Sequence, residues 1–201
     1  GRMTDAEAGD IIGRIHFAEN VSEFHDCELV IEAIIEDLDI KQKVFIELES
    51  GTGSNTILAT NTSSLSVTSI AGACNNPGRI LGLHFFNPAP VMPLVEIIPG
   101  LATNHENVER VYELMNVWKK SPVIAKDTPG FIVNRFLCLL YNEAADQIYK
   151  GYATAQDIDL GLKLGSNHPM GPVEIMDMAG VDVVNNALKA LYEMTGEERY
   201  K

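Results

Sequence analysis

Three short stretches decide the fold of this chain: Asn61-Thr62-Ser63-Ser64-Leu65, then Leu83-His84-Phe85-Phe86-Asn87-Pro88, then Leu94-Val95-Glu96-Ile97. The second and third are apolar, strand-like segments on either side of a proline-rich turn, and each carries one ionisable residue. An unpaired charge is costly to bury, so we expect His84 and Glu96 to be partners. A carboxylate beside an imidazole favours the protonated ring, which allows a histidine to accept a proton near neutral pH. The pattern therefore indicates acid–base catalysis.

The segments around these stretches alternate between strand-like and helical patterns, which indicates an α/β protein. Strands are predicted at 27–35, 56–60, 79–85, 94–98 and 123–125, with a buried first strand. An amphipathic helix after Glu36 would bury Ile40, Val44, Phe45 and Leu48, and a helix capped by Asn104 would carry a second apolar stripe. Thr4 and Glu7 have the spacing of a capping box, which predicts a short helix to about Arg14. Ser63 and Ser64 follow the strand 56–60, at the edge where open α/β sheets bind ligands.

No strand is evident after residue 126, and the pattern beyond it is helical throughout. Thr128 is expected to cap a long helix, with Pro129 in its first turn, that runs towards Lys150. Further helix boundaries are predicted at Thr154, Gly165, Pro172 and Asp182. We therefore predict two domains, a partial sheet domain over residues 1–126 and a helical C-terminal domain over residues 127–201.

Composition and charge exclude several classes of protein. The chain has 201 residues and a formal net charge of −13, with no basic run, so we expect no nucleic-acid binding. No apolar stretch is long enough to span a membrane, and Gly1-Arg2-Met3 lacks the apolar core of a signal peptide. Cys27, Cys74 and Cys138 are widely spaced, which predicts reduced thiols rather than a disulfide framework or a metal site.

The three opening stretches and the later run Asp127-Thr128-Pro129-Gly130-Phe131-Ile132-Val133-Asn134-Arg135 resemble the 3-hydroxyacyl-CoA dehydrogenase family. The similarity covers nearly the whole chain, with the motifs in the family's order and at its spacing, which is far more specific than a lone glycine motif. The resemblance implies a partial Rossmann-type doubly wound sheet followed by an all-helical C-terminal domain. It also implies NAD-dependent oxidation of an (S)-3-hydroxyacyl-CoA, such as 3-hydroxybutyryl-CoA, to the 3-oxoacyl-CoA.

The resemblance also implies roles for individual residues. His84 would be the general base, with Glu96 orienting its imidazole, and Ser63 and Asn134 would hydrogen-bond the substrate oxygen. Contacts to the nicotinamide side of NAD would come from Ala33, Glu36, Lys41, Ser63 and Asn87. Each role has a structural alternative. His84 could be a core histidine with satisfied hydrogen bonds, Glu96 a solvent-facing strand residue, and Ser63 a helix cap. Asn134 could be an exposed helical residue, and Glu36 and Lys41 could be solvated charges at a helix start.

Such dehydrogenases open with a strand, a G-x-G-x-x-G turn and a helix that binds the cofactor pyrophosphate. The sequence holds no such segment, and Gly51-Thr52-Gly53 fits an ordinary turn between a helix and a strand. We therefore expect a chain truncated at both ends that binds NAD weakly or not at all and is inactive alone.

Two alternatives remain open: a noncatalytic fragment that dimerises through its helical domain, and a dehydrogenase of a small polar hydroxy acid. The resemblance further implies a homodimer through the helical domain. It also implies a cytoplasmic location, or the mitochondrial matrix if the source is eukaryotic.

Overall fold

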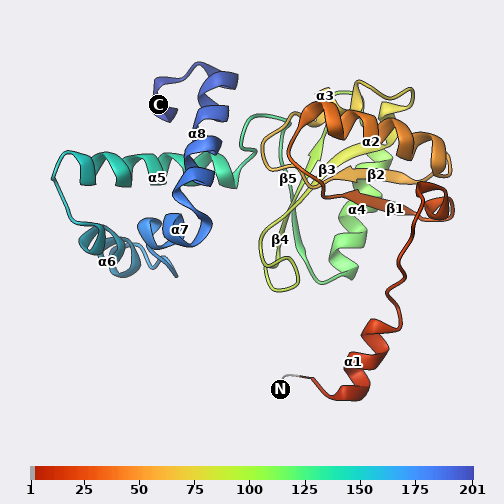
Figure 1. Cartoon of the computed structure of the whole chain (residues 1–201), viewed down its shortest axis with the longest axis horizontal. Helices are drawn as coiled ribbons and strands as arrows, with labels where there is room; N and C mark the ends of the chain where they lie inside the picture. The colour runs from red at the N-terminus through yellow and green to blue at the C-terminus, as the bar shows by residue number, and fades with distance from the viewer. Residues whose placement is uncertain (1–2) are drawn as a thin grey trace.

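The computed structural model describes residues 3–201 and contains a helix-covered sheet with a group of helices beside it (Figure 1). The sheet has five strands in the order β1-β2-β3-β4-β5. They are β1 (Leu29–Glu32), β2 (Ile57–Thr60), β3 (Ile80–Phe85), β4 (Leu94–Pro99) and β5 (Ser121–Ile124). Strands β1, β2 and β3 run parallel, β4 is antiparallel to β3, and β5 is parallel to β4. The predicted Rossmann-type α/β fold is thereby confirmed.

Helices cover both faces of the sheet, because successive side chains of each strand point to opposite faces. On one face, α2 (Leu38–Gly51) and α3 (Val67–Ala71) pack Phe45 and Ile70 against Leu58. On the other, α4 (His105–Val117) packs Val111 and Met115 against Ile57. Figure 1 shows α2 and α3 above the sheet and α4 below it. The short 3-10 helices η1 (Val21–Phe24) and η2 (Pro77–Arg79) lie in the connections.

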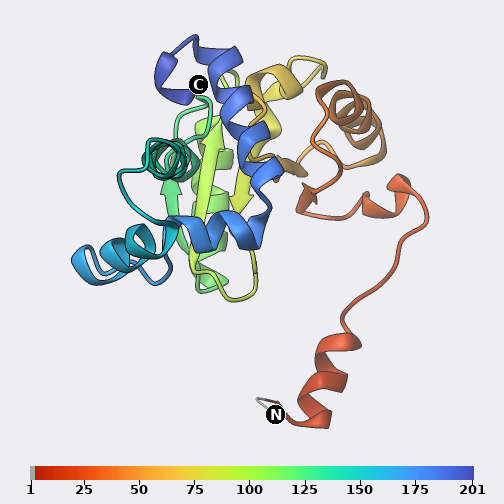
Figure 2. The ribbon, with the colours of Figure 1, turned by 60° about the vertical axis from the view of Figure 1, so that its left-hand side comes forward.

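The N-terminal helix α1 (Asp5–Ile12) stands away from the rest of the chain in both views (Figures 1 and 2). It starts as expected, with the Thr4 side chain accepting from the N–H of Glu7 in a capping box. None of its residues is buried, and Phe17 in the following segment is 95% exposed. Helix α1 therefore contributes nothing to the core.

The helical part contains α5 (Val133–Tyr149), α6 (Ala155–Gly165), α7 (Pro172–Ala179), α8 (Val181–Thr195) and the 3-10 helix η3 (Glu198–Tyr200). Its own core is built around Tyr141, Ile158, Met176 and Val184. The boundaries predicted at Thr154, Gly165 and Pro172 are confirmed, and no described residue after 126 lies in a strand. In residues 3–201, no helix combines the length and apolar character of a transmembrane span.

The start of the long helix differs from the prediction. Pro129 does not begin α5, because the backbone turns first, with Gly130 at φ 73° and Phe131 at φ 46°. These values lie in the left-handed region, which cannot continue a right-handed helix. The N–H of Phe131 closes the turn onto the carbonyl of Thr128, and α5 begins only at Val133.

Two burial predictions also differ. Strand β1 is shorter than 27–35 and its first three residues are only half-buried, because β1 lies at the edge of the described sheet. In α2, Ile40 is 41% exposed whereas Lys41 is buried together with Phe45 and Leu48. The buried charge of Lys41 has carboxylate partners, which explains how it is accommodated there.

Candidate active site

His84 and Glu96 face each other on the antiparallel strands β3 and β4, where they are in register. The Nδ1 of His84 lies 2.8 Å from Oε2 of Glu96, and the two residues are 4% and 0% exposed. The expected pairing is confirmed, and a solvent-facing Glu96 is excluded. Because a carboxylate only accepts hydrogen bonds, Nδ1 carries the proton and Nε2 of a neutral His84 is left as an acceptor.

The second oxygen of Glu96 binds the start of the helical part. Oε1 accepts from the N–H groups of Ile132 and Val133, each at 3.0 Å. Burial alone would raise the pKa of Glu96, but the hydrogen bonds from His84 and from these two N–H groups outweigh it and hold the pKa below its ordinary value. Glu96 is therefore a carboxylate at neutral pH, and it joins His84 to the first turn of α5.

Ser63 and two aromatic rings complete the surroundings of His84. The Oγ of Ser63 lies 3.3 Å from Nε2 of His84, on the side opposite Glu96. The rings of Phe86 and Phe131 pack against the imidazole at centroid distances of 4.7 and 5.7 Å. The imidazole is thus fixed by one carboxylate and two aromatic neighbours, and its Nε2 points to the loop after β2.

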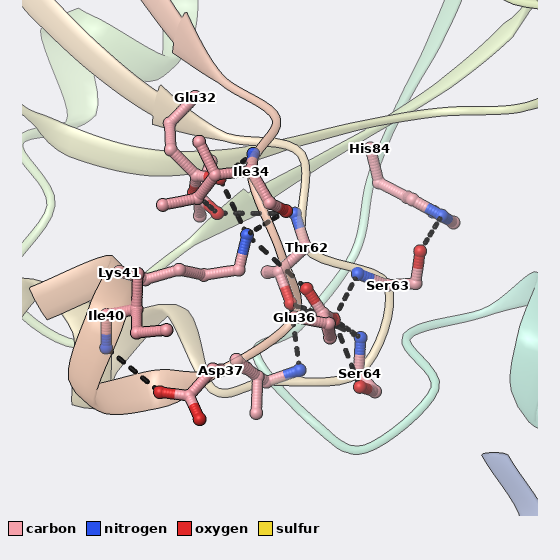
Figure 3. Close-up of polar contacts among 12 residues, drawn as sticks. Glu32, Ile34, Glu36, Asp37, Ile40, Lys41, Thr62, Ser63, Ser64 and His84 are labelled. Atoms are coloured by element: carbon pink, nitrogen blue, oxygen red, sulfur yellow. Dashed lines mark hydrogen bonds and ion pairs between the residues drawn. The ribbon is translucent and has the colours of Figure 1, made fainter. Parts of the chain in front are cut away.

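Glu36 holds that loop in place. Its Oε1 accepts from the hydroxyls of Thr62 and Ser64 and from the N–H groups of Ser63 and Ser64, at 2.6–3.1 Å (Figure 3). Burial would raise the pKa of Glu36, but these hydrogen bonds and the nearby Lys41 ammonium outweigh it and lower the pKa. The carboxylate therefore stays charged and fixes the backbone that carries Ser63.

Lys41 lies behind Glu36 and links it to the end of β1. Its Nζ is 2.7 Å from Oε1 of Glu32 and 3.4 Å from Oε2 of Glu36 (Figure 3). Glu32 also accepts from the hydroxyl of Thr60 and from the N–H of Ile34. The side chains of Lys41 and Glu32 are each 1% exposed, so they form a buried ion pair between α2 and β1. The Thr60 hydroxyl connects β2 to the same carboxylate.

A cavity of about 630 Å³ opens beside Ser63, between the strand ends and the helical part. Ala33, Ile34, Glu36, Asn61, Ser63 and Ser64 line its sheet side. The opposite side is mainly apolar and comes from α5, α8 and the turn before α5: Gly130, Asn134, Cys138, Val183, Asn186, Ala187, Ala190, Leu191 and Met194. Burial raises the pKa of Cys138 to about 11, so its thiol is neutral and acts as an apolar wall.

The structure brings most of the expected site residues together. Ala33, Glu36, Ser63 and Asn134 line one cavity, and His84 with Glu96 lies directly behind Ser63. Asn87 is exposed in the loop after β3 and does not line this cavity, and the Lys41 ammonium faces Glu32 and Glu36 instead. The roles assigned to Asn87 and Lys41 remain predictions.

Sequence reasoning missed three groups that shape the site: Glu32, Phe131 and the α8 wall. Glu32 had a usable signal, since it is a charged residue in a Leu-Val-Ile run and therefore needs a buried partner. Phe131 and α8 had no such signal in the sequence, because their contacts with the site join segments that are far apart in the chain.

Comparison with known proteins matches almost the whole chain to the models of one family. Residues 1–128 match the family model described as 3-hydroxyacyl-CoA dehydrogenase, NAD binding domain. Residues 130–201 match the model described as 3-hydroxyacyl-CoA dehydrogenase, C-terminal domain.

Individual relatives agree with these matches. The chain is 42% identical over 200 residues to 3-hydroxybutyryl-CoA dehydrogenase of Clostridioides difficile, covering 100% of this chain and 71% of the relative. It is 44% identical over 173 residues to mitochondrial hydroxyacyl-coenzyme A dehydrogenase of Homo sapiens, covering 86% of this chain and 55% of the relative.

A solved structure shows the same fold. The crystal structure of (S)-3-hydroxybutyryl-CoA dehydrogenase from Ralstonia eutropha superposes with a TM-score of 0.95 at 38% identity, covering 100% of this chain and 71% of that one. The family models alone span both the sheet part and the helical part. The chain therefore belongs to the 3-hydroxyacyl-CoA dehydrogenase family.

Proposed function

We propose that this protein oxidises the 3-hydroxyl group of an (S)-3-hydroxyacyl-CoA, such as 3-hydroxybutyryl-CoA, to the 3-oxo group, with NAD as the hydride acceptor. The observation that carries the proposal is the buried pair of His84 and Glu96, whose free Nε2 faces Ser63 beside the cavity. Family membership supports the reaction, and the site supplies the base that it needs.

His84 is the general base of this proposal. Its Nε2 accepts the proton of the substrate hydroxyl, while Nδ1–H stays bonded to Glu96. The charge that develops on the imidazole is balanced by the ionised Glu96 carboxylate, which is itself held by the N–H groups of Ile132 and Val133. In the reverse direction the same imidazolium returns the proton to the substrate oxygen.

Ser63 and Asn134 position the substrate oxygen. Ser63 Oγ lies 3.3 Å from Nε2, so a substrate oxygen on the cavity side of this pair would be within hydrogen-bond reach of both groups. Asn134 lines the same cavity from the first turn of α5, on the opposite side. The substrate carbon would thereby be held between the sheet part and the helical part, where water is restricted.

Bound NAD would supply the acceptor for the hydride that leaves the substrate carbon. The cavity fits its nicotinamide side: Ala33 and Ser63 lie at the ends of β1 and β2, and the Glu36 carboxylate can accept from ribose or amide groups. Lys41 would act through Glu36, and Asn87 would contact the nicotinamide side from the loop after β3. The sequence holds no G-x-G-x-x-G cradle, so residues of this chain account for the nicotinamide side only.

The remaining wall of the cavity favours an acyl substrate over a small polar hydroxy acid. Its α8 side is mainly apolar, with Asn186 the polar exception, and Glu36 is the one charged residue among those lining the cavity. An acyl chain can bury apolar surface there, whereas the phosphates of coenzyme A would require cations or N–H groups elsewhere.

We also propose that two copies associate through the helical part. Its outer surface carries large, exposed apolar side chains, among them Tyr149, Tyr152, Leu160 and Leu164, which are 89%, 75%, 53% and 79% exposed. Apolar groups of this size mark interaction surfaces when they cluster, and a homodimer would cover them.

The test of the activity is NADH oxidation with acetoacetyl-CoA. It compares this chain with a chimera in which the N-terminal segment of the Clostridioides difficile relative precedes it, each with and without His84→Ala. Activity in the chimera that His84→Ala abolishes would support the dehydrogenase. A chimera that binds NADH but does not turn over acetoacetyl-CoA would favour a noncatalytic dimerising protein instead.

A further inference from the structure

Residues 125–132, here called the crossover, connect β5 to α5 and carry an uncommon backbone. Gly130 and Phe131 both have positive φ, at 73° and 46°. A Cβ at Gly130 would lie 3.0 Å from the backbone nitrogen of Arg135, so the turn is tight as well as left-handed. A bulky residue such as Phe131 keeps such a conformation only where its surroundings impose it.

Asp127 supplies the first of these restraints. Its Oδ2 accepts from the N–H of Thr68 at 2.7 Å and from the hydroxyl of Ser66 at 2.9 Å, and its Oδ1 accepts from the N–H of Val67 at 2.9 Å. These donors stand at the start of α3, about 60 residues earlier in the chain. Asp127 therefore fastens the first part of the crossover to the sheet part.

Glu96 supplies the second restraint, at the other end of the crossover, through the N–H groups of Ile132 and Val133. Between the two carboxylates, Phe131 is 4% exposed and packs with Val67, Ile98 and Ala125. Val67 thus meets the crossover twice, with its N–H on Asp127 and its side chain on Phe131. The two restraints act on one short, strained segment.

We propose that Asp127 is a positioning residue for the dehydrogenase reaction, an inference that rests on the proposed function. By fixing the crossover against α3, Asp127 sets where the first turn of α5 lies. That turn carries Asn134 into the cavity and presents the N–H groups of Ile132 and Val133 to Glu96. Asp127 does not line the cavity, and its hydrogen bonds go to Ser66, Val67 and Thr68 rather than to His84, so it would act through these groups.

The direct test introduces Asp127→Ala and Asp127→Asn into the chimera of the activity test, which carries the N-terminal segment of the Clostridioides difficile relative. Asp159→Asn in the same chimera is the matched control. Asp159 is a buried carboxylate, 8% exposed, that likewise accepts from N–H groups at a helix start, those of Val173 and Glu174 in α7. If these carboxylates contribute only to stability, the Asp127 and Asp159 variants should both melt at a lower temperature and keep the kcat of their parent. If Asp127 positions the site, its variants alone should lose kcat.

For the Asp127 variants we expect kcat with acetoacetyl-CoA to fall roughly ten- to hundredfold, because small misplacements of reacting groups are costly, while the KM for NADH stays within about twofold. Asp159→Asn should lower the melting temperature and leave kcat unchanged. An Asp127 variant that melts at a lower temperature but keeps the kcat of its parent would overturn the proposal.

A second measurement on the 201-residue chain does not depend on activity. Amide hydrogen exchange at Ile132 and Val133 should accelerate in Asp127→Ala, and more weakly in Ser66→Ala, which removes one of the three partners. Unchanged exchange in both variants would also overturn the proposal. Accelerated exchange combined with a parent enzyme that does not reduce acetoacetyl-CoA would refute the proposed function and leave the restraint itself established.

Discussion

His84 on β3 and Glu96 on β4 are in register across an antiparallel strand pair, and their side chains meet with 2.8 Å between Nδ1 and Oε2. Side chains directly opposite each other lie on the same face of a sheet, so the strand pairing itself brings the imidazole and the carboxylate together. The carboxylate then reaches past the sheet to the start of α5.

Replacement of His84 by Ala should remove the base. We expect kcat to fall roughly a hundred- to ten-thousandfold in the acetoacetyl-CoA assay, which is the usual contribution of general acid–base catalysis. The matched control is His105→Ala, because His105 also pairs with a glutamate, Glu109, but on an exposed helix surface. Equal losses in both variants would contradict the role of His84.

Glu96→Gln should be nearly as damaging although it keeps the shape of the side chain. If the Gln oxygen continues to accept from Ile132 and Val133, its NH2 group faces Nδ1 of His84. The imidazole must then carry its proton on Nε2, where it cannot accept one from the substrate. We expect kcat to fall on the order of a thousandfold or more, as a wrong tautomer does in other His–carboxylate sites. Glu109→Gln, measured in parallel, should be silent.

Acid should destabilise the protein through Glu96 and Glu36. The folded-state pKa of each carboxyl lies below its ordinary value, so its stabilisation is complete above the unfolded pKa, about 4.3, and is lost as the pH falls through the lower folded pKa. Urea unfolding between pH 7 and pH 3 should therefore show stability falling at the acid end. Glu36→Gln should flatten this decline; a curve parallel to that of the parent would contradict the assignment.

Lys41→Met should destabilise the fold strongly, because it leaves the buried carboxylate of Glu32 without its cation. The expected loss in the free energy of unfolding is about 3–5 kcal/mol, typical of removing one partner of a buried ion pair. The double variant Lys41→Met with Glu32→Gln removes the unpaired charge and should recover part of that loss. Urea denaturation of the parent, the two single variants and the double variant gives the coupling free energy between Lys41 and Glu32. Losses in the free energy of unfolding that simply add would show that the pair is not energetically linked.

Leu164→Glu should weaken self-association, since Leu164 is 79% exposed on α6 in the proposed dimer surface. Sedimentation velocity over a range of concentrations would measure the shift towards monomer. Leu101→Glu provides the control, because Leu101 is 91% exposed on the sheet part. A parent chain that sediments as a monomer at high concentration would remove the proposal of a homodimer.

Much of the fold could be predicted because its signals are local. The runs that form β2, β3 and β4 are apolar and bounded by turn residues, and Thr4, Thr154 and Pro172 mark helix starts by their own chemistry. The pairing of His84 with Glu96 was also within reach, since two ionisable residues in adjacent buried strands have few other partners. Where local rules misled, as at Pro129, two residues with positive φ had delayed the helix.

The sequence by itself determined the resemblance to the family, the order of strands and helices, and the expected pairing of His84 with Glu96, because each rests on local motifs or on residue types at short spacing. Only the tertiary structure decided that Lys41 is buried against Glu32, that Glu96 also binds the start of α5, and that Asp127 binds the start of α3. Each of these contacts joins segments that are distant in the chain. Their formation depends on where the sheet places backbone N–H groups in space, and no periodicity or spacing in the sequence encodes that position.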